Sequence, residues 1–362
     1  MMDNQRTIDS FFKCKSDNGK EYYVKKYFYL DWSKEGAHPI EDAQWLFNKP
    51  KHMNFCHKVT CDFIKKGYFF YICGNFEEYE THEFQISKEK KYKNSWFLKS
   101  HLQKTVRMMD DQRALPTAMH LMQLDINEFL RRMTIIHLED TFLHQSWTTL
   151  LWLMIALPKK FKMKKYIYEW MLGFVYITCI TKKKDDCHKK LKGLELLKKY
   201  KNIFDELNSY HDMKLSKNQE SILYSLHIRC AFGGMGCDII MIENYIKLWK
   251  TRFINKSMCI TNVMKIRPIS IFMNDLPLEN WDLRSIDYHC QSKFNEYILK
   301  KYPELGNLET INKIIWIHNS GLNKRLEENE NYKKMNEYKK DEWLLIKKYV
   351  QRMQRYFLTC NY

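Results

Sequence analysis

Apolar residues recur at helical spacing over most of the chain, and this periodicity limits the folds open to it. From Ser95 onward Leu98, Leu102 and Val106 repeat every three or four residues, and similar stretches follow. The longest covers residues 332–358 and carries a stripe made of Trp343, Ile346, Val350, Met353 and Phe357. No fixed period recurs, which argues against a repeat array. We therefore expect a mainly α fold of multi-helix domains.

Charged residues divide the helical stretch between residues 95 and 147. Asp110 and Asp111 are expected to end a first helix, and a second covers 114–124. Asp125, with Glu128 three residues later, matches an N-terminal capping box for a third helix. Asp140 falls on the apolar face of that third helix, so its carboxylate must find a partner or the helix must end there. We expect Asp140 to cap a further helix over 141–147.

A small β-containing region precedes the helices. Two runs rich in aromatic and β-branched residues, 55–63 and 68–73, flank the turn signal Lys65-Lys66-Gly67 and predict a hairpin. Residues 83–86 are a candidate third strand. The expected organisation is a flexible tail over 1–20, a small α+β region over 21–94, a helical domain over 95–215, and a C-terminal helical region over 216–362 that ends in a long basic helix.

The charge of the chain constrains its partners. Sixty lysines and arginines against 43 acidic residues give a formal net charge of +17, which favours nucleic acid or another anionic surface as a partner. A generally lysine-rich composition is the alternative. The apolar stretches 147–157 and 166–180 fall short of the roughly 20 residues of a membrane span. No secretory signal opens the chain, and its 11 cysteines form no framework, so we expect a reducing compartment and no membrane contact.

The motif at residues 5–12 is compact. Gln5 is followed three residues later by Ile8, and then by the adjacent rings Phe11 and Phe12. In one turn of 3₁₀ helix the three apolar side chains share a side, because residues i and i+3 eclipse. Such a plug suits insertion into a pocket of a partner protein. The alternative is that the rings anchor the N-terminus on the core of this chain.

This motif resembles the PCNA-interacting peptide (PIP box) of proteins that bind the sliding clamp. Replicative DNA ligases and uracil-DNA glycosylases carry such a box in a mobile N-terminal tail. The resemblance implies that Gln5 enters the polar pocket of the clamp, and that Ile8, Phe11 and Phe12 enter its hydrophobic pocket. It also implies a role in DNA replication or DNA repair.

Residues 96–157 resemble the helical collar of clamp-loader-type ATPases, and most closely that of the replication-associated recombination AAA+ family. The resemblance rests on the helix 100–107, the alanine-rich stretch 114–122, and a paired arginine followed by an apolar stretch that ends at Glu139 and Asp140. In that family the collar mediates oligomerisation, which implies a homo-oligomer here.

The chain lacks the ATPase of that family. No Gly-x-x-x-x-Gly-Lys-Ser/Thr loop is present, so nothing is built to hold the phosphates of ATP. The composition and the missing ATPase suggest a viral accessory protein from a large DNA virus. Such a protein would act in the nucleus or in a cytoplasmic viral replication factory.

Few residues suggest catalysis or metal binding. Nuclease chemistry needs carboxylates that converge on divalent cations, and the best local pairs are Glu139 with Asp140 and Asp287 with His289. Neighbouring residues of a helix diverge by about 100°, so one carboxylate of the first pair would point away from a shared metal. Solvated or capping carboxylates explain the residues of both pairs better. We expect no cofactor, with a divalent cation only if the chain is a nuclease.

Two further clusters of residues suggest a ligand site, but each also has a purely structural explanation. A set of possible zinc ligands lacks a clear second ligand pair, so alternating residues on a half-buried sheet explain it better; the set is His52, Cys56, His57, Cys61 and Cys73. Gly233, Gly234 and Gly236 precede a helix and could present amides to a phosphate, but a turn before a helix explains them as well.

Basic residues gather in three blocks, and two of the blocks contain aromatic residues. Lysines and arginines make salt-sensitive contacts to a nucleic-acid backbone, and aromatic rings stack on unpaired bases. The alternative is a set of solvated helix faces. The residues are Lys159, Lys160, Lys162, Lys164 and Lys165, then Lys182, Lys183 and Lys184, and finally Lys347, Lys348, Arg352 and Arg355.

These features predict a DNA replication or repair accessory protein. It would bind the sliding clamp through residues 5–12 and contact DNA through its basic helical surfaces. The first alternative is a metal-dependent DNA-processing enzyme, a nuclease recruited by the clamp. The second is a viral structural or host-interaction protein without DNA activity.

Overall fold

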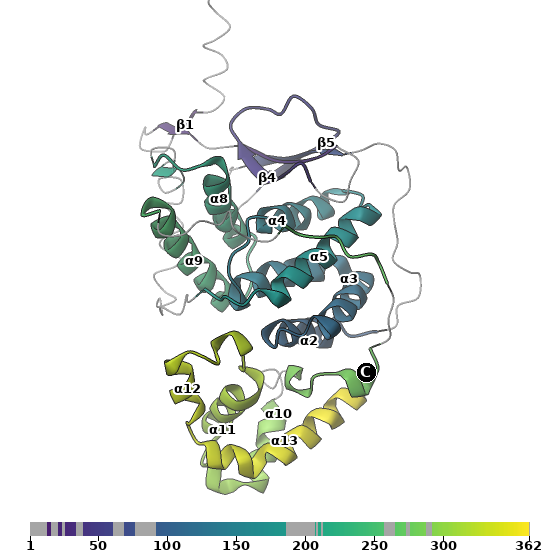
Figure 1. Ribbon diagram of the computed structural model, residues 1–362, viewed down its shortest axis with the longest axis vertical. Coiled ribbons are helices and arrows are strands. Elements are labelled where there is room, and N and C mark those ends of the chain that lie inside the picture. Colours follow the sequence, from purple (N-terminus) through teal and green to yellow (C-terminus); the bar gives the residue numbers. More distant parts are fainter. Residues whose placement is uncertain are drawn as a thin grey trace, which may run out of the picture. The chain divides into compact units, whose positions relative to one another are not determined.

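The chain is mainly helical with a small sheet near its N-terminus, which confirms the expected fold class (Figure 1). The computed structural model describes residues 13–15, 21–23, 26–33, 39–60, 69–76, 92–185, 207, 209–210, 213–256, 265–272, 276–286 and 292–361. The chain forms two compact units. Unit 1 comprises 1–84, 143–167 and 186–265, and unit 2 comprises 85–142, 168–185 and 266–362. Each unit therefore combines three separate stretches, whereas the sequence suggests contiguous regions.

A four-stranded sheet organises unit 1. Its strand order is β4-β3-β6-β5, with the outer pairs antiparallel and the central pair β3–β6 parallel. The antiparallel pair β5–β6 confirms the predicted pairing of these two runs. The predicted turn at 65–67 and the candidate strand at 83–86 lie outside the described residues. The strands are β3 (Tyr27–Trp32), β4 (Glu41–Leu46), β5 (Phe55–Thr60) and β6 (Phe69–Phe76). A separate antiparallel pair joins β1 (Lys13–Lys15) to β2 (Glu21–Tyr23), so residues 13–15 of the expected tail form a strand.

One face of the four-stranded sheet packs on helices of unit 1. Phe28 of β3 is fully buried and stacks on Trp45 of β4 with ring centroids 4.6 Å apart. The Nε1–H of Trp152 in α4 (Trp147–Ala156) donates to the backbone carbonyls of Phe28 and Cys73. This indole therefore ties α4 to the two central strands. The short 3₁₀ turn η1 (Leu157–Lys159) follows α4.

Two side-chain hydroxyl groups accept hydrogen bonds from backbone N–H groups of the edge strand β4. The backbone N–H of Ala43 donates to Thr149 Oγ1 at 3.0 Å. The N–H of Trp45 donates, also at 3.0 Å, to Ser221 Oγ of α8 (Lys217–Ala231). Free N–H groups at a sheet edge invite pairing with another chain, so these two hydroxyls protect the edge.

The glycine cluster forms a turn between α8 and α9 (Gly236–Ile254). Gly233 has φ +73° and Gly234 has φ +151°, values that favour glycine. Met235, the residue before α9, makes no side-chain cap, and Asp238 places an acidic group in the first turn. A carboxylate in that turn opposes anion binding, so this segment is a turn before a helix.

Unit 2 begins with two long helices, α2 (Ser95–Arg107) and α3 (Asp111–Asp140). Asp110 caps α3, and α3 is kinked at Asp125, whose φ and ψ are −159° and 98°. Asp125 Oδ1 accepts from the backbone N–H of Glu128 at 3.1 Å, which confirms the predicted cap. The Glu128 carboxylate does not complete the box, because it pairs with Lys99 at 2.5 Å. The helix expected over 141–147 is wrong, since α4 begins only at Trp147.

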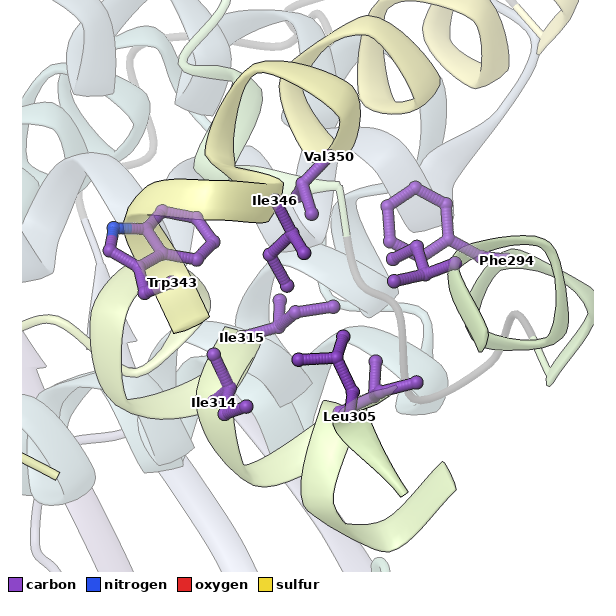
Figure 2. Close-up of a cluster of buried hydrophobic side chains, with 9 residues drawn as sticks. Phe294, Leu305, Ile314, Ile315, Trp343, Ile346 and Val350 are labelled. Carbon is purple, nitrogen blue, oxygen red and sulfur yellow. The ribbon is translucent and has the colours of Figure 1, made fainter. Parts of the chain in front are cut away.

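The C-terminal helices of unit 2 share a hydrophobic cluster (Figure 2). Trp343, Ile346 and Val350 of the last helix point toward Ile314 and Ile315, and Met353 and Phe357 pack against the cluster, so the predicted stripe is confirmed. The cluster draws on α10 (Ser292–Lys301), α11 (Leu308–Ile315) and α13 (Lys340–Asn361). The short helix α12 (Glu330–Asn336) precedes α13 and contributes no residue to it. Short turns connect them, among them η5 (Leu283–Ser285), η6 (Pro303–Leu305), η7 (Trp316–Ser320) and η8 (Lys324–Leu326).

Candidate nucleic-acid interface

The outer face of α13 is basic. A helix that buries one stripe exposes the positions between, and the sequence fills several of those positions with cations. No acidic residue occurs between residues 343 and 361, and the two carboxylates of the helix, Asp341 and Glu342, lie in its first turn. The exposed cations are Lys347, Lys348, Arg352 and Arg355. All four predicted basic residues of the last helix are therefore accessible.

Helix α10 lies antiparallel to α13 and adds to this surface. Phe294 and Phe357 have ring centroids 5.8 Å apart, and so do Tyr302 and Tyr349. Moving from the first pair to the second advances eight residues from Phe294 to Tyr302 and goes back eight residues from Phe357 to Tyr349, so the two segments run antiparallel. The Lys301 ammonium lies 4.4 Å from the centre of the Tyr349 ring, a cation–π contact between the two helices.

We call the line of residues along this helix pair the tyrosine–cation seam. Tyr297 and Tyr356 are 51 % and 62 % exposed. The hydrogen bond between Tyr356 and the Cys360 thiol, with a smaller electrostatic effect of Tyr297, raises the pKa of Tyr356, so this phenol stays neutral. The seam consists of Tyr297 and Lys301 on α10, and of Tyr349, Arg352 and Tyr356 on α13.

The other two basic blocks differ from α13. In the first block, Lys160, Lys162 and Lys165 are exposed while Lys159 and Lys164 are half-buried. Its ring Phe161 is buried against Trp152 and cannot stack on a base. In the second block, Lys182 and Lys183 are exposed, and the Lys184 ammonium donates to the backbone carbonyl of Glu139. Neither block combines exposed cations with exposed rings.

Glu139 and Asp140 form part of a buried polar network. Arg107 donates through Nε to Asp140 at 2.8 Å and through Nη2 to Glu139 at 2.7 Å. Gln103 Nε2 also donates to both carboxylates, at 2.8 and 3.0 Å. Burial raises the pKa of Asp140, but the charge of Arg107, with Lys184 and these hydrogen bonds, outweighs burial and holds the pKa below its usual value. Asp140 is thus a paired structural carboxylate and not the cap of a following helix.

Two further cations of this network hold backbone carbonyls. Lys104 Nζ donates to the carbonyls of Asn319, Ser320 and Leu322, and burial, followed by the charge of Arg107, lowers its pKa to about 7. Arg325 donates to the carbonyl of Val106 near the end of α2, and to three carbonyls at the end of α5 (Lys165–Ile180), those of Thr178, Cys179 and Thr181. These groups tie distant segments of unit 2 together.

The possible zinc ligands do not gather in the described part of the chain. No group of three or more His, Cys, Asp or Glu side chains there could hold a metal ion. Cys56 and Cys73 are direct register partners on β5 and β6, with Sγ atoms 3.0 Å apart. Burial, followed by the contact with Cys56, raises the pKa of Cys73.

Several predicted site residues lie outside the described residues. They are the clamp-binding residues Gln5, Ile8, Phe11 and Phe12, the second carboxylate pair Asp287 and His289, and the possible zinc ligand Cys61. None of the described helices is both long and apolar enough to cross a membrane.

No protein-family model, curated protein or solved structure matches this chain. The stretch that resembles a clamp-loader collar is divided here, because α2 and α3 belong to unit 2 and α4 to unit 1.

Sequence reasoning missed the α10 half of the basic surface. The signal was present as Tyr297 followed by Lys300 and Lys301, and as Tyr349, Arg352 and Tyr356 on the last helix. Residues three or four apart lie on one face of a helix, so each set marks a mixed cationic and aromatic face. What the pattern could not show is that the two faces meet.

Proposed function

We propose that this protein binds DNA through the basic face of α13 and is brought to replicating or repaired DNA by the sliding clamp, which the motif at 5–12 binds. The surface of α13 and α10 supports the DNA-binding part of this proposal. The clamp-binding part rests on the resemblance of Gln5, Ile8, Phe11 and Phe12 to a PIP box.

The observation that carries the proposal is the four-cation face of α13. Lys347, Lys348, Arg352 and Arg355 are all exposed on one helix whose last 19 residues contain no carboxylate. DNA phosphates attract such a face without regard to base sequence, and each phosphate contact releases counterions. The proposed role is that of an accessory protein held at the clamp.

DNA binding is tested by removing the charge of this face. The full chain carrying K347Q, K348Q, R352Q and R355Q is titrated with a labelled DNA duplex at several salt concentrations. We expect at least tenfold weaker binding at low salt, and a log–log salt dependence shallower by up to about 3 to 4. The matched control carries K160Q, K162Q, K182Q and K183Q, which removes four exposed charges from the other two blocks. Equal losses in both variants, or a loss only in the control, would contradict the assignment to α13.

Clamp binding is tested separately. The full chain should bind a purified PCNA ring, and the double substitution F11A and F12A should abolish that binding, because the two rings supply most of the apolar contact. The Arg6→Ala variant changes a residue between the defined positions of the motif and should bind as the natural chain does. Undiminished binding by the double variant would remove the clamp from the proposed function.

A further inference from the structure

We infer that the tyrosine–cation seam binds single-stranded nucleic acid, with Tyr297 and Tyr356 as stacking platforms for unpaired bases. This inference rests on the proposed function and deepens it, because it states which form of nucleic acid the α10–α13 surface recognises.

The first step is the position of the rings. Tyr297 and Tyr356 stand on two antiparallel helices that are joined by the ring contact of the buried Phe294 with the half-buried Phe357. Each tyrosine lies next to its phenylalanine or within one turn of it, yet it is more than half exposed. The phenylalanines therefore anchor the helix pair, while the tyrosines are left at the surface.

The second step is the placement of charge around the rings. Lys300 and Lys301 are exposed within one turn of Tyr297, and Arg352 and Arg355 are exposed within one turn of Tyr356. Glu296 is the exposed acidic residue of α10 beside Tyr297. The local excess of cations complements the phosphates of a strand whose bases lie on the rings.

The third step separates single strands from duplexes. Cations alone attract both forms, because both carry phosphates. A ring can stack on a base only where the base face is open, which is the case in unpaired strands. The half-buried Tyr349, about 10 Å along α13 from Tyr356 at 1.5 Å per residue, continues the seam with Lys301 over its face. The exposed rings thus predict a preference for unpaired nucleic acid.

The test compares two forms of DNA on the full chain. Oligo-dT of 20 nucleotides and a duplex of equal length are titrated against the natural chain and against Y297A with Y356A. We expect the double variant to bind oligo-dT about 5- to 100-fold more weakly, with the duplex changed less than threefold. Y297F with Y356F keeps both rings and should bind as the natural chain does. Because both side chains are exposed, the thermal midpoint of each variant should match that of the natural chain.

The outcomes separate the two proposals. If the four-charge variant of α13 binds duplex and oligo-dT as the natural chain does, the proposed DNA-binding function fails. If the charge variant loses binding but Y297A with Y356A weakens both forms equally or neither, the single-strand inference alone is overturned. Oligo-rU of equal length shows whether the strand is DNA or RNA. Competition by polyglutamate as strong as that by oligo-dT would mean that the surface recognises charge only, and would also overturn the inference.

Discussion

His101 shows how unit 2 keeps a titratable group in its interior. Its side chain is fully buried on α2. Nε2 accepts from the backbone N–H of Asp282, so the proton resides on Nδ1 and is donated to Thr117 Oγ1 at 2.8 Å. Burial lowers the pKa of His101 to about 3, with Asp282 opposing the shift and Arg113 adding to it. The neutral ring therefore belongs to the folded state over most of the pH range.

This geometry predicts an acid-sensitive fold. The histidine of the unfolded chain takes up a proton below about pH 6.5, while the folded one stays neutral down to about pH 3. The unfolded state thus binds more protons in that window, and the stability falls as the pH falls through it, by up to about tenfold in the unfolding equilibrium per pH unit. Denaturant unfolding at pH 7, 6, 5 and 4 measures this slope.

The control for this prediction is His101→Gln, which keeps one acceptor and one donor but does not titrate. Its unfolding free energy should depend on pH less steeply between pH 6 and pH 4, because unfolding of the variant takes up as much as one proton fewer. Parallel pH profiles for the two chains would show that His101 does not report on the acid sensitivity.

At the scale of single elements, the sequence predicts those features whose cause is local. The cap at Asp125, the antiparallel pairing of β5 with β6 and the apolar stripe of α13 all depend on residues close in sequence, and all are present. The parallel pairing of β3 with β6 depends on strands about 40 residues apart. The residue pattern of β3 alone does not predict which strand it pairs with.

The partner of Asp140 has the same long-range origin. A carboxylate on an apolar helix face requires a partner, and that requirement was visible in the sequence. The partner, Arg107, comes from the preceding helix, and Asn323 approaches from the C-terminal part of the chain. The periodicity of the sequence predicts that this polar group is buried, but only the packed structure shows which residue pairs with it.

The kink of α3 yields a prediction at the same scale. Asp125→Ala removes the acceptor for the Glu128 N–H and should lower the free energy of unfolding by about 1 kcal/mol. Asp125→Asn keeps a side-chain acceptor and should cost only a few tenths of that. Urea unfolding of the two variants beside the natural chain measures the difference. Equal stability of the Ala and Asn variants would mean that the cap does not stabilise the kinked helix.

For the whole molecule, the proposed clamp motif and the basic surface of α10 and α13 occupy opposite ends of the chain. Two weak attachments on one chain act together, because the second becomes intramolecular once the first has formed. The net charge of +17 favours nucleic acid in general, so the distribution of charge, and not its sum, decides where the strand lies. The composition alone therefore does not show which surface binds the strand.

The proposed function therefore predicts avidity. The full chain should bind DNA that carries a loaded PCNA ring at least tenfold more tightly than the same DNA without the ring. The variant F11A with F12A should lose this gain and keep its affinity for bare DNA. Fluorescence anisotropy at physiological salt measures both quantities. Identical affinities with and without the ring would separate the motif from the DNA-binding surface.

The contacts of the Arg325 guanidinium predict how the protein responds to truncation. Carbonyls at the end of a helix lack partners within the helix, and Arg325 supplies donors to the ends of both α2 and α5. A chain cut before residue 320 would remove the Arg325 donors, and the ammonium of Lys104 would lose the carbonyls of Ser320 and Leu322. The segment 319–325 is therefore no appendage that can be trimmed away, and its loss should destabilise α2 and α5, which lie far earlier in the chain.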